Sequence, residues 1–152
     1  MEFTFFNSLL IFFVIIFIWM LISVYNICKP LEIQVNELAA DIESTKIKLN
    51  RVAAEISSLL HKYSIHESDM FKAIVSGNSN IQVLGIKYPQ LNADSIFLNA
   101  SSSWDRLYSE LQTSVVRYNQ KITEYNISVT NFPNIIFCYM LTFRVKIHAK
   151  IT

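Results

Sequence analysis

The side chains best suited to chemistry are two histidines and a glutamate near the middle of the chain: His61, His66 and Glu67. A zinc peptidase helix carries the motif HExxH, in which two histidines one turn apart bind the metal and the glutamate is the general base. Here Met70 occupies the place of the second histidine, and His61 lies five residues before His66, on another part of a helix surface. We therefore expect solvated histidines and no metal site. A metal-dependent hydrolase that uses these three side chains is the alternative.

The sequence lacks the other common patterns of catalytic and ligand-binding sites. Cys28 and Cys138 stand 110 positions apart, which is no cysteine metal spacing, and Gly77 and Gly85 do not form a phosphate loop. The chain has no G-x-S-x-G nucleophile elbow. Its formal net charge of +1 provides no strong field for nucleic acid. We expect a protein that is not an enzyme, with no catalytic residues, no cofactor, no small-molecule substrate and no nucleic-acid partner.

The elements that position any functional surface begin with a long apolar segment. Of 152 residues, 52% are hydrophobic and 16% are charged, against about 25% charged in an average soluble domain. No charged side chain occurs between Phe3 and Cys28. As a helix, the run from Phe5 to Val24 would rise about 30 Å, the thickness of a bilayer's hydrocarbon core. Residues 1–28 are therefore predicted to form a transmembrane anchor. Its representative side chains are Phe5, Leu10, Phe13, Ile16, Trp19 and Val24.

A cleaved signal peptide and a buried core helix are the alternatives to an anchor. A signal peptide needs a basic beginning and a small-residue cleavage site, whereas Glu2 precedes this run and no A-x-A pattern follows it. A core helix that is apolar on every face needs more protein around it than a small chain provides. Because Lys29 follows the span, the positive-inside rule predicts a single-pass protein with its C-terminal part in the cytoplasm. A periplasmic or extracellular position is the alternative.

Beyond the anchor, the spacing of apolar residues is that of a long helix. Between Leu31 and Tyr63 these residues recur at alternating steps of three and four, with Thr45 at the one polar position. Such a heptad pattern is typical of coiled coils and helical bundles. Pro30 suits the first turn of this helix and could kink its junction with the anchor.

A second heptad pattern runs from Trp104 to Phe132. Ser102 and Asp105 resemble a capping box at its start, and Pro133 is expected to end it. The remaining predicted elements are a shorter helix over 66–85, punctuation at Gly85 and Tyr88-Pro89, a short helix over 135–141 and an extended tail from about 142 with period two. Residues 29–152 are thus predicted to form an antiparallel helical bundle of the all-α class.

Several different short motifs are distributed over nearly the whole chain. They are Tyr25-Asn26, His66-Glu67, Tyr88-Pro89-Gln90-Leu91-Asn92-Ala93, Phe97, Tyr118-Asn119, Tyr125-Asn126, Phe132-Pro133 and Phe143. Each motif alone is weak, but YPxLxA, YNxxxxxYN and FP in this order and spacing are specific together. On these residues the chain resembles the LemA family. The resemblance implies a single N-terminal anchor in a bacterial cytoplasmic membrane, followed by a bundle with long antiparallel helices.

The same resemblance implies a role in assembly, because LemA proteins have no agreed enzymatic activity and some occur beside membrane proteases or are implicated in bacterial membrane organelles. The chain departs from the family pattern at two places. Leu49-Asn50-Arg51 and Ile56-Ser57-Ser58-Leu59 replace a basic pair and an Ile-Pro-Asn-Leu run, and Tyr108-Ser109 and Ser114-Val115 replace Glu-Asn and Ala-Arg. If the lost charges serve a function in the family, this member lacks it.

Two surfaces are candidates for contacts. The Tyr-Asn pairs at 118–119 and 125–126 lie seven residues apart on one helical stripe and serve either core packing or an interface. The apolar residues after Pro133 exceed what a small core accommodates. Residues 134–152 are therefore predicted to contact a second copy of the chain or another membrane protein such as a protease, while the anchor contacts the lipid bilayer. The basic side chains of the tail, Arg144, Lys146 and Lys150, could face anionic lipid or an acidic partner. The candidate interaction residues are Tyr118, Asn119, Tyr125, Asn126, Phe137, Phe143, Val145 and Ile147.

Overall fold

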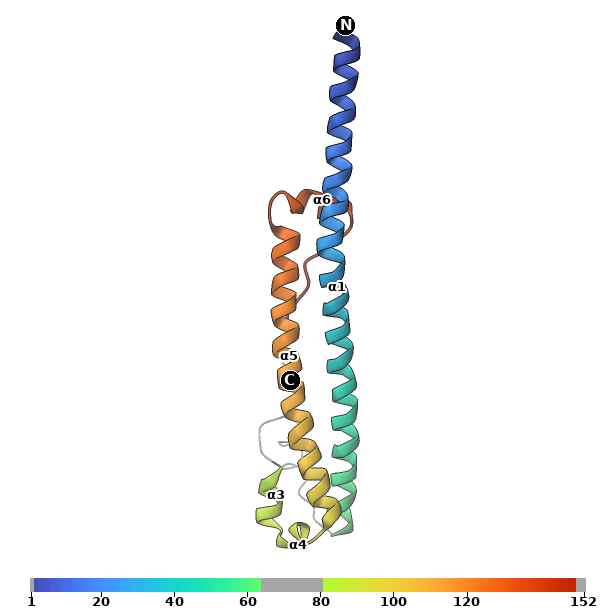
Figure 1. Ribbon diagram of the computed structural model, residues 1–152. Coiled ribbons are helices and arrows are strands. Elements are labelled where there is room, and N and C mark those ends of the chain that lie inside the picture. The colour runs from blue at the N-terminus through green and yellow to red at the C-terminus, as the bar shows by residue number, and fades with distance from the viewer. Residues whose placement is uncertain (1, 64–80, 150–152) are drawn as a thin grey trace. The chain divides into compact units, whose positions relative to one another are not determined.

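The computed structural model describes residues 2–63 and 81–149, with side chains from residue 6 onward (Figure 1). The regular elements are α1 (Glu2–Lys62), α3 (Gln82–Lys87), α4 (Pro89–Asn92), α5 (Ser95–Thr130) and α6 (Asn134–Met140). No strand occurs within these described ranges, and residues 143–149 follow α6 without regular structure. The predicted all-α class is confirmed. Most of the predicted helix over 66–85 lies outside the described residues.

The predicted anchor and the first heptad helix form one continuous element. α1 comprises 61 residues and passes through Pro30, although proline removes one helical hydrogen bond and usually kinks a helix. Pro30 itself is exposed, whereas Cys28 and Val35 on either side of it are buried. Packing of the flanking turns therefore holds the helix together where the sequence predicted a junction.

Contacts divide the chain into two units, to each of which α1 and α5 contribute a part. One unit consists of residues up to Glu37 together with Tyr118–Ala149, and the other lies within Leu38–Arg117. The second unit confirms both heptad patterns. Its buried apolar side chains include Ile42, Leu49, Ile56 and Leu59 of α1, Leu84 and Leu91 of α3 and α4, and Phe97, Trp104, Leu111 and Val115 of α5.

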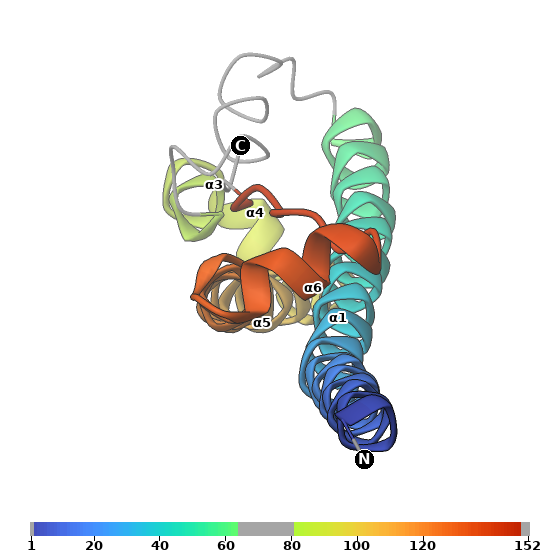
Figure 2. The same ribbon diagram turned by 90° about the horizontal axis from the view of Figure 1, so that it is seen from above.

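The first unit contains the predicted anchor, the end of α5, α6 and the tail. Its core consists of Val24, Cys28, Val35, Ile122, Tyr125, Val129, Phe137 and Cys138. Seen from above, α6 lies across the end of α5 and reaches α1 (Figure 2). The short helix therefore joins the end of α5 to α1.

Two predicted details of α5 are wrong. The helix begins at Ser95, where the Asp94 carboxylate accepts a hydrogen bond from the Ile96 N–H at 2.9 Å, as an N-cap side chain does. Ser102 and Asp105 lie inside the helix, and Ser102 donates to the Asn99 carbonyl instead. At the other end α5 stops at Thr130, so Phe132 leaves the heptad face and is 81% exposed.

Candidate functional site

The C-terminal tail is fastened to α5 by the two asparagines of the Tyr-Asn repeat. The Asn126 side-chain amide donates to the Lys146 carbonyl at 2.9 Å, and its oxygen accepts from the Lys146 N–H at 2.9 Å. Asn119 makes the same pair of hydrogen bonds with Ala149, at 2.9 and 2.8 Å. Each amide thus satisfies both backbone groups of one tail residue, as a neighbouring strand would.

The spacing of the repeat matches the spacing of the tail. Seven residues of α-helix, from Asn119 to Asn126, rise about 10.5 Å. Three residues of extended chain, from Lys146 to Ala149, span about 10 Å. Because the two rises agree, both asparagines can reach the tail at once. This explains the repeat as a structural device and favours the packing interpretation of the two pairs.

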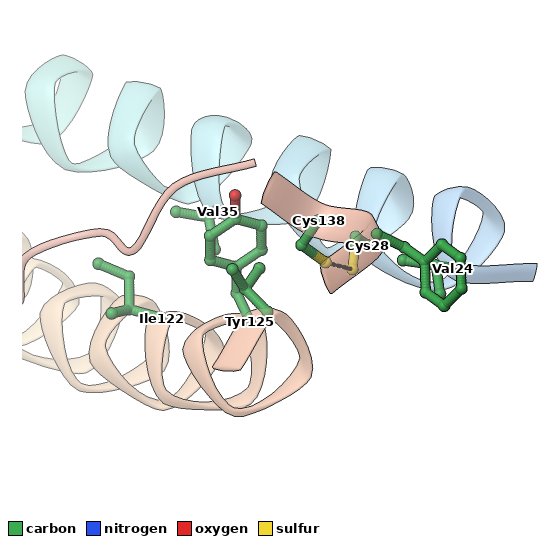
Figure 3. Close-up of a cluster of buried hydrophobic side chains, with 8 residues drawn as sticks. Val24, Cys28, Val35, Ile122, Tyr125 and Cys138 are labelled. Atoms are coloured by element: carbon green, nitrogen blue, oxygen red, sulfur yellow. Dashed lines mark hydrogen bonds between the residues drawn. The ribbon is translucent and has the colours of Figure 1, made fainter. Parts of the chain in front are cut away.

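Tyr125 is part of the core of this unit, and its ring points from α5 toward α1 (Figure 3). Its side chain is 1% exposed, and the Lys146 ammonium lies 5.4 Å from the centre of its ring. Burial raises the pKa of the Tyr125 phenol, and the nearby Glu32 carboxylate adds to this, while a backbone hydrogen bond from Arg144 opposes it. The phenol is therefore neutral at physiological pH and acts as a packing group.

The candidate interaction residues fall into three groups by exposure. Tyr125 and Phe137 are buried, and Tyr118, Asn119, Asn126 and Phe143 are half-buried. Phe143 packs on the core of this unit, and its ring centre lies 6.2 Å from that of Tyr25. Val145 and Ile147 are 59% and 87% exposed. Of the predicted contact residues in the tail, these two present the most free apolar surface.

α6 connects the tail region to the predicted anchor. The ring of Phe137 lies 5.6 Å from that of Phe17. The thiols of Cys28 and Cys138 lie 3.5 Å apart and are buried (Figure 3). Both cysteines are free, and their contact joins positions that the sequence separates by 110 residues.

The predicted anchor residues differ in their surroundings. Leu10, Phe13 and Trp19 are 52%, 60% and 68% exposed, and Ile16 is partly buried. Phe5 lies in the helix, but its side chain is outside the described set. Val24 is only 4% exposed, because it packs in the core cluster with α6. Val24 therefore faces the core, while Ile22 and Ile27 on the other sides of the helix leave apolar surface exposed, at 54% and 47%.

The titratable groups form one notable cluster, in the Leu38–Arg117 unit. The Tyr63 hydroxyl donates to Asp94 at 2.8 Å, and the Lys62 ammonium lies 3.3 Å from the same carboxylate oxygen. The hydrogen bond from Tyr63, followed by that from the Ile96 backbone, lowers the pKa of Asp94. Sequence reasoning missed this cluster, since 31 residues separate Tyr63 from Asp94. Its three side chains interact with one another, and Asp94 also caps the N-terminus of α5.

The histidine cluster is only partly described. His61 is exposed at the end of α1, and His66 and Glu67 lie outside the described residues. In the described part of the chain, no group of three or more His, Cys, Asp or Glu side chains could hold a metal ion. The hydrolase alternative therefore depends on residues that the structure does not describe.

Comparison with known proteins identifies one family. The sequence profile described as the LemA family matches residues 68–151, a range that contains both asparagines and almost the whole tail. Neither the curated proteins nor the solved structures contain a match to the chain.

Proposed function

The chain belongs to the LemA family, and from this premise we propose that it is a membrane-anchored helical-bundle protein that acts by binding other proteins. Its partner is a second copy of the chain or another membrane protein, such as a membrane protease. The bundle lies on the cytoplasmic face of a bacterial membrane. The protein carries out no reaction of its own.

The observation that carries this proposal is the exposure of the N-terminal part of α1. Within the described residues, α1 is the one helix long and apolar enough to cross a membrane, and only 6% of its most apolar stretch is buried. A soluble protein would hide such a surface in its core. Lipid is the solvent in which a helix that is apolar on all sides is stable.

The orientation follows from charges at the two ends of the apolar run. Glu2 precedes it and Lys29 follows it, so the positive-inside rule favours a cytoplasmic bundle. Lys29 is held by an ion pair with Glu32 at 2.8 Å. A periplasmic bundle is the competing orientation.

The binding role rests on what the polar side chains of the described bundle do. Asn119, Asn126 and Asp94 all have structural partners within the chain. In contrast, Val145 and Ile147 leave apolar surface on the tail that the described part of the chain does not cover. Exposed apolar side chains next to a polar rim are typical of protein contacts.

The anchor is tested by carbonate extraction of membranes that contain the full chain. The chain should stay in the pellet and keep its original N-terminus. A mature N-terminus near residue 30 would show a cleaved signal peptide instead. Protease added to spheroplasts should leave a cytoplasmic bundle uncut.

The contact is tested with a photo-crosslinking amino acid at Ile147 in native membranes, followed by mass spectrometry. Ile47, which is 55% exposed on α1, is the matched control position. Crosslinks from position 147 to a second copy or to a membrane protein, absent from position 47, would support the proposal. Stoichiometric zinc in the purified chain that is lost on His66→Ala would favour the hydrolase.

A further inference from the structure

Exposed apolar side chains form a surface on the turn after α5 and on the outer side of α6. Its side chains are Phe132, Ile135, Ile136, Tyr139 and Met140, with exposures of 81%, 46%, 53%, 86% and 56%. α6 contains no charged residue. A surface of this kind is unstable in water unless something covers it.

The position of α6 along α1 indicates what covers it. Phe137 touches Phe17, inside the apolar run, and Cys138 touches Cys28 at its end. α6 therefore lies beside the last turns of the apolar segment, and α1 continues beyond it toward the N-terminus (Figure 1). Lipid that surrounds α1 at Phe17 would also meet the outer side of α6.

The length of the free apolar segment leads to the same place. From Phe3 to Ile22, which is still 54% exposed, the helix rises about 28 Å, close to the roughly 30 Å of a hydrocarbon core. Extending the count to Val24 brings the rise to about 31 Å, and Val24 packs in the cluster that contains α6. A hydrocarbon core counted from Phe3 therefore ends at the level of α1 where α6 packs.

The polar groups nearby are placed as a membrane boundary requires. Tyr25 of α1 and Tyr139 of α6 are exposed, and their amphipathic rings favour the level of the lipid headgroups. The Lys29–Glu32 ion pair comes one turn beyond Cys28, and the exposed Arg144 follows α6 along the chain. Charges thus begin where the apolar surface ends.

We propose that the Phe132–Met140 surface is a second membrane contact, inserted among the lipids at the boundary of the bilayer beside α1. Its occupant is lipid, not a second copy of the chain. The inference rests on the proposed membrane anchor. It adds that the bundle is held against the membrane at two places.

The test uses tryptophan fluorescence of the full chain in phosphatidylcholine–phosphatidylglycerol vesicles with brominated acyl chains, which quench emission on contact. The two native tryptophans are replaced (Trp19→Phe, Trp104→Phe), and single tryptophans are introduced by Tyr139→Trp, Phe13→Trp or Ile47→Trp. Phe13 reports the anchor itself, and Ile47 reports bundle surface away from lipid. Circular dichroism verifies the helix content of each variant.

We expect Tyr139→Trp to lose most of its emission in brominated vesicles, comparably with Phe13→Trp, while Ile47→Trp loses little. Quenching of Phe13→Trp alone would overturn the second contact and leave the anchor standing. A blue-shifted but unquenched Tyr139→Trp would overturn it in favour of a protein contact, such as a second copy. No quenching at either position would mean that the chain does not insert, and both proposals would fail.

Discussion

Asn126 holds the C-terminal tail against α5, so the loss of its side chain should make release of the tail easier by an amount that the hydrogen bonds determine. Asn126→Ala removes two hydrogen bonds to Lys146, of 2.9 Å each. A net value of about 1 kcal/mol per hydrogen bond makes release of the tail about 2 kcal/mol easier, or about 30-fold more frequent. The helix propensity gained by alanine does not offset this, because α5 stays helical whether the tail is bound or released.

Global unfolding should respond less than tail release. In global unfolding α5 also loses its helix, so the higher helix propensity of alanine stabilises the folded variant by about 0.6 kcal/mol. The net loss in free energy of unfolding is therefore about 1.4 kcal/mol. Asn50→Ala is the matched control, since Asn50 is exposed on α1. That change should raise global stability by about 0.6 kcal/mol and leave the tail alone.

The assay is limited proteolysis of the full chain in detergent, supported by hydrogen exchange. Trypsin cuts after Arg144 and Lys146 only when the tail is released, and the cutting rate then follows the released population. The Ala149 amide keeps its own partner, Asn119, in the variant, so faster exchange there reports release of the tail as a unit. Equal cleavage rates for Asn126→Ala and Asn50→Ala would refute this reasoning.

Three further predictions concern other parts of the chain. Thr142 has a φ of 63°, a left-handed conformation that is strained for a β-branched residue, so Thr142→Gly should raise stability by about 0.5 kcal/mol in urea unfolding, while Thr142→Val should not. The lowered pKa of Asp94 stabilises the fold above pH about 4 and ceases to do so as the pH falls through that pKa. Tyr63→Phe should therefore be less stable than the parent at pH 7, and the deficit should shrink at lower pH; a constant deficit in urea titrations would contradict this. Leu111→Asp and Ile42→Asp place a charge at positions that are 5% and 8% exposed and should cost about 5 kcal/mol, enough to abolish the thermal transition. Ile47→Asp and Val116→Asp, each at a position 55% exposed, should melt near the parent temperature.

The sequence alone was sufficient for the features that depend on local periodicity and polarity. The heptad spacing predicted the buried faces of α1 and α5, because residues three and four apart share a helix face whatever surrounds them. Pro133 likewise predicted an end of α5 close to the observed Thr130, and the short helix expected over 135–141 corresponds to α6. The alternation after Leu141 predicted an extended tail in place of a helix, and residues 143–149 are not helical. The charge-free run likewise lies in the one helix of the described residues that is long and apolar enough to cross a membrane.

Only the tertiary structure revealed contacts between segments far apart in the chain. The pairing of Asn119 with Ala149, of Tyr63 with Asp94 and of Cys28 with Cys138 depends on which helix faces meet, and no local spacing encodes that choice. The start of α5 was misjudged for a related reason: the Asp94 carboxylate caps the helix at Ser95, while Ser102 and Asp105 only resemble a cap in sequence. Tertiary packing also explains why α1 continues through Pro30. The buried contacts of the turns before and after Pro30 outweigh the one backbone hydrogen bond that proline cannot make.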